Sequence, residues 1–420
     1  MVFVNDLGQS APWWMHHIQP SNADGMTLAD VVFPFFLFIA GVSIPLAFQA
    51  AKRRGDTRLK IFSHILLRSF GLILMGLIEV NRSAEIGMGP DRWGLLAFVS
   101  IILAWCVVPK KQKTNDQQVE RSSLKRNILI ALKTIGVLGL VIAFVIYRRE
   151  PVKTNVLFLG DVESWQWIRT EWWGILGLIG WAYLTSALVC FFAGSRREWL
   201  MAAVGLLMLN FLVSQHGGFF TTPIESAGDE AIPRWSIFVW LESAIIFVNK
   251  YVYIESQLGS LPAIVMSGCV LGTILKSDSE VSSSKDRIKW ALGFSVGLFL
   301  AGAMTYTFAG INKIDATPTW CFWCAALATL LWIALYFVMD VKGWQGWSII
   351  VRPAGANPLI AYLLHPILLF ILSLTGLGAS VRAYAASPSA WTAIGGSLAM
   401  ALVICALTAL IAKLGLRIRI

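Results

Sequence analysis

Apolar segments of about 20 residues, separated by short polar links, recur along almost the whole chain. A helix needs about 20 mostly apolar residues to cross the roughly 30 Å hydrocarbon layer, where every backbone N–H and C=O must be paired. Hydrophobic residues make up 57% of the chain and charged residues only 14%, a balance that is rare in soluble proteins of this size. The sequence therefore predicts an all-α, polytopic transmembrane helix bundle.

The hydropathy pattern predicts about eleven spanning helices. We expect them near 27–50, 61–80, 93–109, 127–147, 172–194, 199–215, 259–275, 290–310, 319–340, 355–375 and 392–412. The first five residues, MVFVN, look like the remnant of another helix whose beginning is missing. The segment 236–249 is short and contains Glu242, so we expect it to be re-entrant or interfacial. The polar link 110–126 shows no sign of a soluble domain, and we expect one domain over 1–420.

The distribution of basic residues predicts an orientation. Lys and Arg near helix ends favour the cytoplasmic side of a membrane. The links at 51–60, 110–126, 195–198, 276–289 and 341–352 and the end at 413–420 hold more than twice as many Lys and Arg as the alternate set, which is longer. We therefore expect an integral protein of the cytoplasmic (inner) membrane, with these basic loops in the cytoplasm.

Composition and motifs exclude several classes of function. The net charge of +10 is spread over short links instead of one face, so we expect no nucleic-acid partner. The six cysteines lie in apolar runs, without the spacing of disulfide frameworks or zinc sites, and we expect no metal. The chain has no P-loop, dinucleotide-binding glycine motif, H-E-x-x-H or nucleophile elbow. Any chemistry must use groups gathered from several helices.

Ionisable residues near or inside apolar segments are the candidates for such chemistry, because they are costly in lipid. His16 and His17 could accept a proton or an acyl group, but beside Trp13 and Trp14 they also suit an interfacial aromatic belt. Asp30 lies one turn into its helix, where it could serve a site or satisfy the helix dipole.

Two further candidates lie deeper in the expected bundle. His365, near the middle of its helix, could instead hydrogen-bond a neighbouring helix. Arg68 could extend its guanidinium to the inner surface.

Several blocks resemble one known family. The run MVFVN, then histidine, then GMTLADVVFPFFLFIAGVSIPLA (25–47) is similar to the heparan-alpha-glucosaminide N-acetyltransferase family of transmembrane acyltransferases and its bacterial relatives. Further similar blocks follow in the same order: LLRSFGLILMG (66–76), ESQLGSLPAIVMSGCVLG (255–272), INKIDATPTW (311–320), MDVKG (339–343) and NPLIAYLLHPIL (357–368). The resemblance is specific in the first block and weak between about 80 and 250.

The resemblance implies an enzyme that moves an acetyl group from cytoplasmic acetyl-CoA, as co-substrate, to an amino-sugar or glycan acceptor on the far side. It implies His17 as the catalytic residue, with His16 as its rival because the spacer before Gly25 is longer than in the family. In the implied mechanism, Asp30 or Glu255 could orient the ring. Further positions that match the family, expected to bind substrate, are Asn5, Glu255, Asn312, Lys313, Asn357 and His365. Candidates for the coenzyme A phosphates, by charge alone, are Arg53, Arg54 and Arg68.

Two other functions are compatible with the same residues. In a transporter or flippase of a glycan or lipid precursor, the polar groups would line a path, but no duplicated halves are visible. A non-catalytic membrane scaffold is the third reading. The expected partners are the lipid bilayer and the acceptor, with a homodimer left open.

Overall fold

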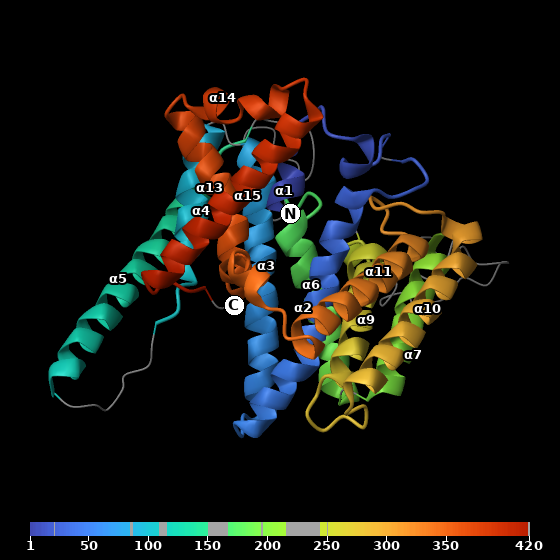
Figure 1. Ribbon diagram of the computed structural model, residues 1–420. Helices are drawn as coiled ribbons and strands as arrows, with labels where there is room; N and C mark the ends of the chain where they lie inside the picture. Colours follow the sequence, from blue (N-terminus) through green and yellow to red (C-terminus); the bar gives the residue numbers. More distant parts are fainter. Residues whose placement is uncertain are drawn as a thin grey trace, which may run out of the picture. The chain divides into compact units, whose positions relative to one another are not determined.

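The computed structural model describes residues 1–20, 22–84, 87–108, 116–149, 167–194, 196–215, 244–249 and 251–418. At 84, 116–123, 125, 214 and 215 it describes the backbone only. The named secondary-structure elements in these parts of the chain are all helices, without a β-strand, so the expected all-α class is confirmed (Figure 1). The predicted segment 236–249 lies mostly outside the described residues, although 244–249 forms a short helix.

The contacts divide the chain into two compact units, each formed by segments far apart in the sequence. Unit 1 comprises Met1–Pro12, Leu74–Gly174 and Gln345–Ile420, and unit 2 comprises Trp13–Ile73 and Ile175–Trp344. Helix α3 (Arg58–Asn81) contributes its first part to unit 2 and its last part to unit 1. The expectation of a single domain stays a prediction.

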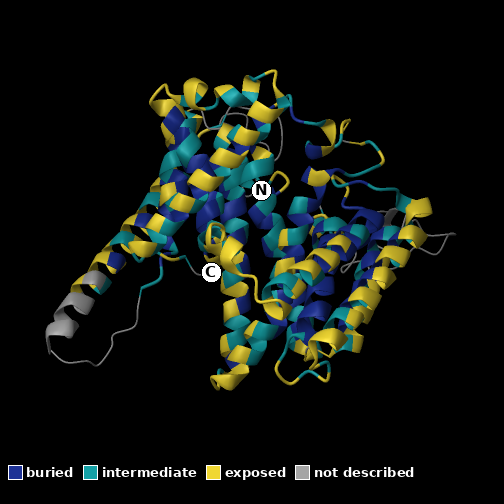
Figure 2. Ribbon diagram, viewed as in Figure 1, coloured by how far each residue is buried: buried dark blue, intermediate teal, exposed yellow. Residues whose placement is uncertain are grey.

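Unit 2 contains the longest apolar helices. Its elements are η1 (Trp13–Met15), α2 (Leu28–Arg53), most of α3, α6 (Gly174–Ala193), α7 (Arg197–Gln215), η3 (Ser256–Ser260), α9 (Leu261–Ile274), α10 (Ser284–Ala309), α11 (Pro318–Tyr336) and η4 (Phe337–Val341). Every residue of α9 is buried, and Figure 2 shows this helix in dark blue (Figure 2). Helix α9 is therefore the centre of the unit, with α2, α7 and α11 packed against it.

The contact between α2 and α9 is unusually close because glycines form it. A Cβ added at Gly268 would lie 2.0 Å from the carbonyl oxygen of Phe38, and one at Gly41 would lie 1.9 Å from that of Val265. Small residues let helix backbones approach closely in lipid, where the hydrophobic effect does not drive helices together. This packing holds the start of α2, which carries Asp30, in a fixed place on the unit.

Unit 1 is built around α4 and the helices from the end of the chain. Its elements are α1 (Val2–Asn5), η2 (Arg82–Ala84), α4 (Pro90–Ala104), α5 (Asp116–Ile146), η5 (Gly346–Ile349), α12 (Arg352–Ala356), α13 (Pro358–Leu374), α14 (Gly378–Val381), η6 (Ala383–Ala386) and α15 (Ala390–Lys413). Helix α4 packs against α5 and α13, and α15 packs against α1, α12 and α13.

All eleven expected spans are helices in the structure. Within the described residues, eight helical segments are long and apolar enough to cross a membrane, and α13 is apolar but shorter. Helix α4 has 15 residues, which corresponds to about 22 Å at 1.5 Å per residue. The protein is thus a multi-pass membrane protein, while eleven crossings remain a prediction.

One boundary was predicted wrongly. Helix α5 begins at Asp116, well before the expected start at 127. The expected start at 127 follows the apolar pattern alone, but the Gln, Glu, Arg and Lys residues of the preceding polar link have good helix propensity. The helix therefore continues beyond its apolar part, which begins at Arg126.

Candidate functional site

The start of α2 holds a buried carboxylate. Thr27 is the N-cap of α2 and Asp30 is its N3 residue, and their side chains form a capping box. Oδ2 of Asp30 accepts hydrogen bonds from the backbone N–H groups of Thr27 and Ile18, both at 3.1 Å. It also lies 2.9 Å from the Thr27 hydroxyl, whose single proton can go either to Oδ2 or to the His16 carbonyl. Asp30 is only 1% exposed. The helix N-terminus, with its partial positive charge, further favours a carboxylate here.

His17 contacts the other oxygen of this carboxylate. Its Nδ1 lies 2.7 Å from Oδ1 of Asp30, and 46% of its side chain is exposed. An ionised carboxylate can only accept hydrogen bonds, so Nδ1 carries the proton and Nε2 keeps its lone pair. Asp30 thus sets the tautomer of His17, as the aspartate does in hydrolase triads.

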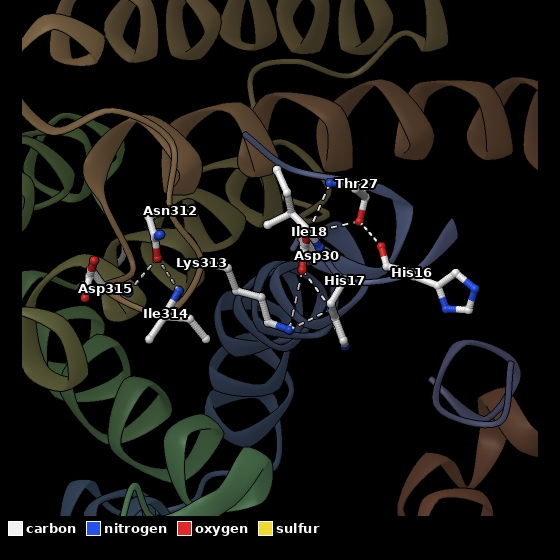
Figure 3. Close-up of polar contacts among 9 residues, drawn as sticks. All are labelled: His16, His17, Ile18, Thr27, Asp30, Asn312, Lys313, Ile314 and Asp315. Atoms are coloured by element: carbon white, nitrogen blue, oxygen red, sulfur yellow. Dashed lines mark hydrogen bonds and ion pairs between the residues drawn. The ribbon is translucent and has the colours of Figure 1, made fainter. Parts of the chain in front are cut away.

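Lys313 completes a group of three charged or titratable side chains (Figure 3). Its Nζ lies 3.6 Å from Oδ1 of Asp30 and 3.0 Å from Nδ1 of His17. The ring nitrogen has one position for a proton, so it cannot donate to Asp30 and accept from Lys313 together. We assign the proton to the His17–Asp30 bond, because that contact is shorter and its acceptor is charged. Burial lowers the pKa of Lys313, and the charge of Asp30 opposes this shift.

The loop that carries Lys313 is shaped by its own polar residues. Oδ1 of Asn312 accepts hydrogen bonds from the backbone N–H groups of Ile314 (2.7 Å) and Asp315 (3.1 Å). The backbone N–H of Asn312 donates to the Thr317 hydroxyl at 2.9 Å. This oxygen of Asn312, expected to contact substrate, therefore organises the loop.

Asp24 joins this loop to the segment that carries His17. Its Oδ1 accepts from the backbone N–H of Ile311 and its Oδ2 from the Tyr306 hydroxyl, both at 2.7 Å. The backbone N–H of Gly25 donates to the Ile311 carbonyl at 2.9 Å. Gly25 has φ of +148°, a conformation that favours glycine. Asp24 therefore lies at the point where the Lys313 loop meets the His17 segment.

His16 and His17 occupy different positions. The ring of His16 points away from Asp30 and Lys313, while its backbone carbonyl is the second acceptor within reach of the Thr27 hydroxyl (Figure 3). Glu255, also in unit 2, precedes the π-helix η3 as its N-cap and is partly exposed. Of the two histidines, the geometry favours His17.

Unit 1 contains a second polar cluster, centred on Asp6. Its side chain is fully buried, and Arg382 contacts Oδ1 through Nε at 3.1 Å and through a terminal nitrogen at 3.0 Å. The Tyr384 hydroxyl donates to Oδ2, and Nε2 of His365 lies 3.6 Å from Oδ1. Burial alone would raise the pKa of Asp6, but the nearby His365, the hydrogen bond from Tyr384 and the charge of Arg382 lower it overall. Burial, together with the hydrogen bond to Asp6, raises the pKa of Tyr384 to about 12.

The remaining candidates of unit 1 have less defined places. Asn5 is the last residue of α1 and is exposed. Asn357 is buried and is the N-cap of α13, with its backbone carbonyl bonded to the N–H of Ala361 at 3.1 Å. The expected site residues thus fall into two groups, one in each unit.

The expected coenzyme A contacts lie at or toward the other end of α2. Arg53 bonds the Ser277 hydroxyl, and Arg54 pairs with Asp56 at 2.9 Å. Arg68 places its guanidinium over the Tyr183 ring at 4.6 Å, and its buried Nε lacks a partner among the described residues. Arg53 and Arg54 thus have hydrogen-bonding partners, whereas Arg68 keeps one nitrogen without such a partner in the described part of the chain.

Several site residues were not assigned roles from the sequence. Thr27-x-x-Asp30 is a capping-box pattern, so Thr27 could have been found from its spacing. Asp24 bonds Tyr306 and Ile311, and Asp6 bonds Arg382 and Tyr384. These partners are far apart in the chain, so no local sequence pattern predicts the contacts. Among the described residues, no three His, Cys, Asp or Glu side chains form a group that could hold a metal ion. The six cysteines are free.

Comparison with known proteins agrees with the resemblance seen in the motifs. The heparan-alpha-glucosaminide N-acetyltransferases of Mus musculus and Homo sapiens are 43% and 40% identical to this chain over 93 residues. Each match covers 22% of this chain and 13% of the relative, so only a small part of those proteins is represented. The suspected relationship is confirmed at this level. Residues 6–259 match the model of the family described as "Domain of unknown function (DUF5009)". Because this match covers more than half of the length of the chain, the chain belongs to the DUF5009 family.

Proposed function

We propose that this protein is a membrane-embedded acyltransferase. It moves an acetyl group from cytoplasmic acetyl-CoA to the amine of an amino-sugar or glycan acceptor on the extracytoplasmic side of the inner membrane. The observation that carries the proposal is the buried Asp30 carboxylate 2.7 Å from Nδ1 of a half-exposed His17. The partial similarity to two N-acetyltransferases supports the reaction class.

Nε2 of His17 performs the chemistry in either of two ways. As a general base, it takes a proton from the neutral acceptor amine as the amine nitrogen attacks the thioester carbon; the C–S bond then breaks, and the coenzyme A thiolate takes this proton from the ring. As a nucleophile, Nε2 forms a bond to that carbon, the C–S bond breaks, and the coenzyme A thiolate takes a proton from water. The acceptor amine then attacks the acetyl carbon, the bond from that carbon to Nε2 breaks, and the amine gives its proton to water. Asp30 stabilises the positive ring that forms on either route.

Lys313 supplies positive charge next to the reacting ring. A cation near the thioester oxygen stabilises the negative charge that develops there during attack. The same ammonium could hold an acidic group of the acceptor. Asp24 contributes indirectly, because it connects the Lys313 loop to the His17 segment.

The donor must span much of the membrane. Asp30 and Arg53 lie at opposite ends of α2, about 34 Å apart at 1.5 Å per residue. The α2–α9 contact leaves no room for the pantetheine arm, since even a Cβ at Gly268 would overlap backbone. Arg68, in α3, is therefore the preferred phosphate contact, and Arg53 and Arg54 provide attraction at the cytoplasmic mouth. The basic links support this orientation.

The test is acetyl transfer by the purified full chain in detergent. Labelled acetyl-CoA and glucosamine, as the simplest amino-sugar acceptor, should yield labelled N-acetylglucosamine. His17→Ala should abolish transfer, whereas His16→Ala, the neighbouring control, should keep it. Coenzyme A release without acceptor in the wild type indicates the acetyl-imidazole route. Full activity of His17→Ala, or loss in His16→Ala alone, would remove the proposed mechanism.

A further inference from the structure

Unit 1 carries an apolar groove along α5 that has no part in the proposed reaction. Its volume is about 530 Å³, within the range of ligand sites. Its lining residues are Leu74, Ala104, Trp105, Lys133, Val137, Leu140, Val141, Phe144 and Val145. Eight of these nine are apolar or aromatic, and the ninth is a lysine.

The groove has the dimensions of one leaflet of a bilayer. Its lining on α5 runs from Lys133 to Val145, which is about 18 Å of helix at 1.5 Å per residue. Half of the hydrocarbon layer is about 15 Å thick. Val137, Val141 and Val145 are 48%, 55% and 65% exposed, on a helix that is apolar enough to span a membrane. An acyl chain lying along α5 therefore matches the groove in both polarity and length.

Lys133 gives the groove a charged end. It lies seven residues inside the apolar part of α5, which begins at Arg126, and it is exposed. A lysine at this depth in lipid is costly unless an anion or the headgroup layer receives it. Within the described part of the chain, no carboxylate forms an ion pair with Lys133.

Other cations lie near the same end of the groove. Arg126 is seven residues before Lys133, two turns away on the same face of α5. The segment after α15 returns to this end, because the backbone N–H of Val107 donates to the Arg417 carbonyl at 2.7 Å. The Arg417 side chain is exposed. Trp105, which lines the groove at the end of α4, is a residue type that favours the headgroup layer.

We propose that this groove binds one anionic glycerophospholipid, with an acyl chain against α4 and α5 and the phosphate at Lys133. The apolar lining holds the chain, and the cations select an acidic headgroup over a zwitterionic one. The site is formed entirely by residues of unit 1 and does not depend on the proposed acyltransferase activity.

The experiment measures lipid retention by native mass spectrometry of the full chain in detergent. Phosphatidylglycerol and phosphatidylcholine with identical acyl chains are added separately at equal concentrations. We expect one phosphatidylglycerol to be retained roughly fivefold or more over phosphatidylcholine, since each Lys or Arg near the surface favours anionic lipid to about that extent. Equal retention of the two lipids would overturn the proposal.

Two variants separate the charge from the groove. Lys133→Gln should remove the preference for phosphatidylglycerol, and Val141→Trp, at a half-exposed position, should fill the groove and lower retention of both lipids. Lys289→Gln is the matched control, because Lys289 is also exposed and near the start of an apolar helix, α10. Thermal unfolding shows that each variant is folded. Unchanged retention in both groove variants, or a dimer that Val141→Trp dissociates without affecting lipid, would contradict the proposal.

Discussion

Replacing Asp30 by asparagine tests the central contact of the proposed site. The substitution keeps the size of the side chain but turns one of its two oxygens into an NH2 group. Oδ2 accepts hydrogen bonds from the backbone N–H groups of Ile18 and Thr27. Oδ1 faces His17 at 2.7 Å and Lys313 at 3.6 Å.

The donors around each oxygen decide how the amide turns. An NH2 group in the Oδ2 position would leave two buried backbone N–H groups without an acceptor, at about 1–3 kcal/mol each. In the Oδ1 position it faces Lys313 at 3.6 Å and His17, whose ring nitrogen can become an acceptor, so this orientation is preferred. Nδ1 of His17 must then accept a hydrogen bond, and its proton moves to Nε2. The atom that should react with the acyl group or the amine loses its lone pair.

The expected loss in kcat is about 10⁴-fold, as for the corresponding change in a serine-protease triad, or about 5.5 kcal/mol. The stability loss should be smaller, about 1.5–3 kcal/mol for a charge-assisted hydrogen bond. The measurements are the rate of labelled acetyl transfer at saturating substrates and thermal unfolding in detergent. The matched control is Asp315→Asn, an exposed carboxylate in the same loop as Lys313, which should keep its activity.

A folded Asp30→Asn variant that keeps more than a tenth of the wild-type kcat would refute this reasoning. The buried carboxylate would then be only a helix cap. Equal losses in Asp30→Asn and Asp315→Asn would also refute it, because the effect would reflect the loop charge and not the tautomer.

Three further measurements follow from the structure. Asp24→Ala should release the Lys313 loop from the His17 segment and lower the kcat of acetyl transfer by up to about 100-fold relative to the wild type. Its unfolding temperature should change little. The lowered pKa of Asp6 stabilises the folded state above the ordinary aspartate value of about 3.9, and this contribution is lost as the pH falls through the folded value. The unfolding temperature should therefore fall more steeply between pH 7 and pH 3 in the wild type than in Asp6→Asn. Gly268→Ala should force α9 from α2 and cost about 1–3 kcal/mol of stability, whereas Gly297→Ala, with open space around it, should be neutral or stabilising.

Hydropathy and spacing were sufficient to predict the helical class and the positions of all eleven expected helices. The reason is that lipid requires long apolar helices. Each of them is a continuous apolar segment, which can be recognised in the sequence without knowledge of the tertiary structure. The same holds for the Thr27–Asp30 cap, which depends on residues three positions apart. The start of α5 was missed because its polar residues form helix readily but do not enter the apolar pattern.

Hydropathy and spacing could not predict which residues come together at the site. His17 and Lys313 are 296 positions apart, and Asp6 and Arg382 are 376 apart. Such contacts depend on how helices pack, and packing in lipid is set by small residues such as Gly41 and Gly268 whose partners the sequence does not name. Residue types indicated which groups could do chemistry. Folding decided that His17, and not His16, lies against Asp30, and that Asp6 and His365 belong to a separate cluster.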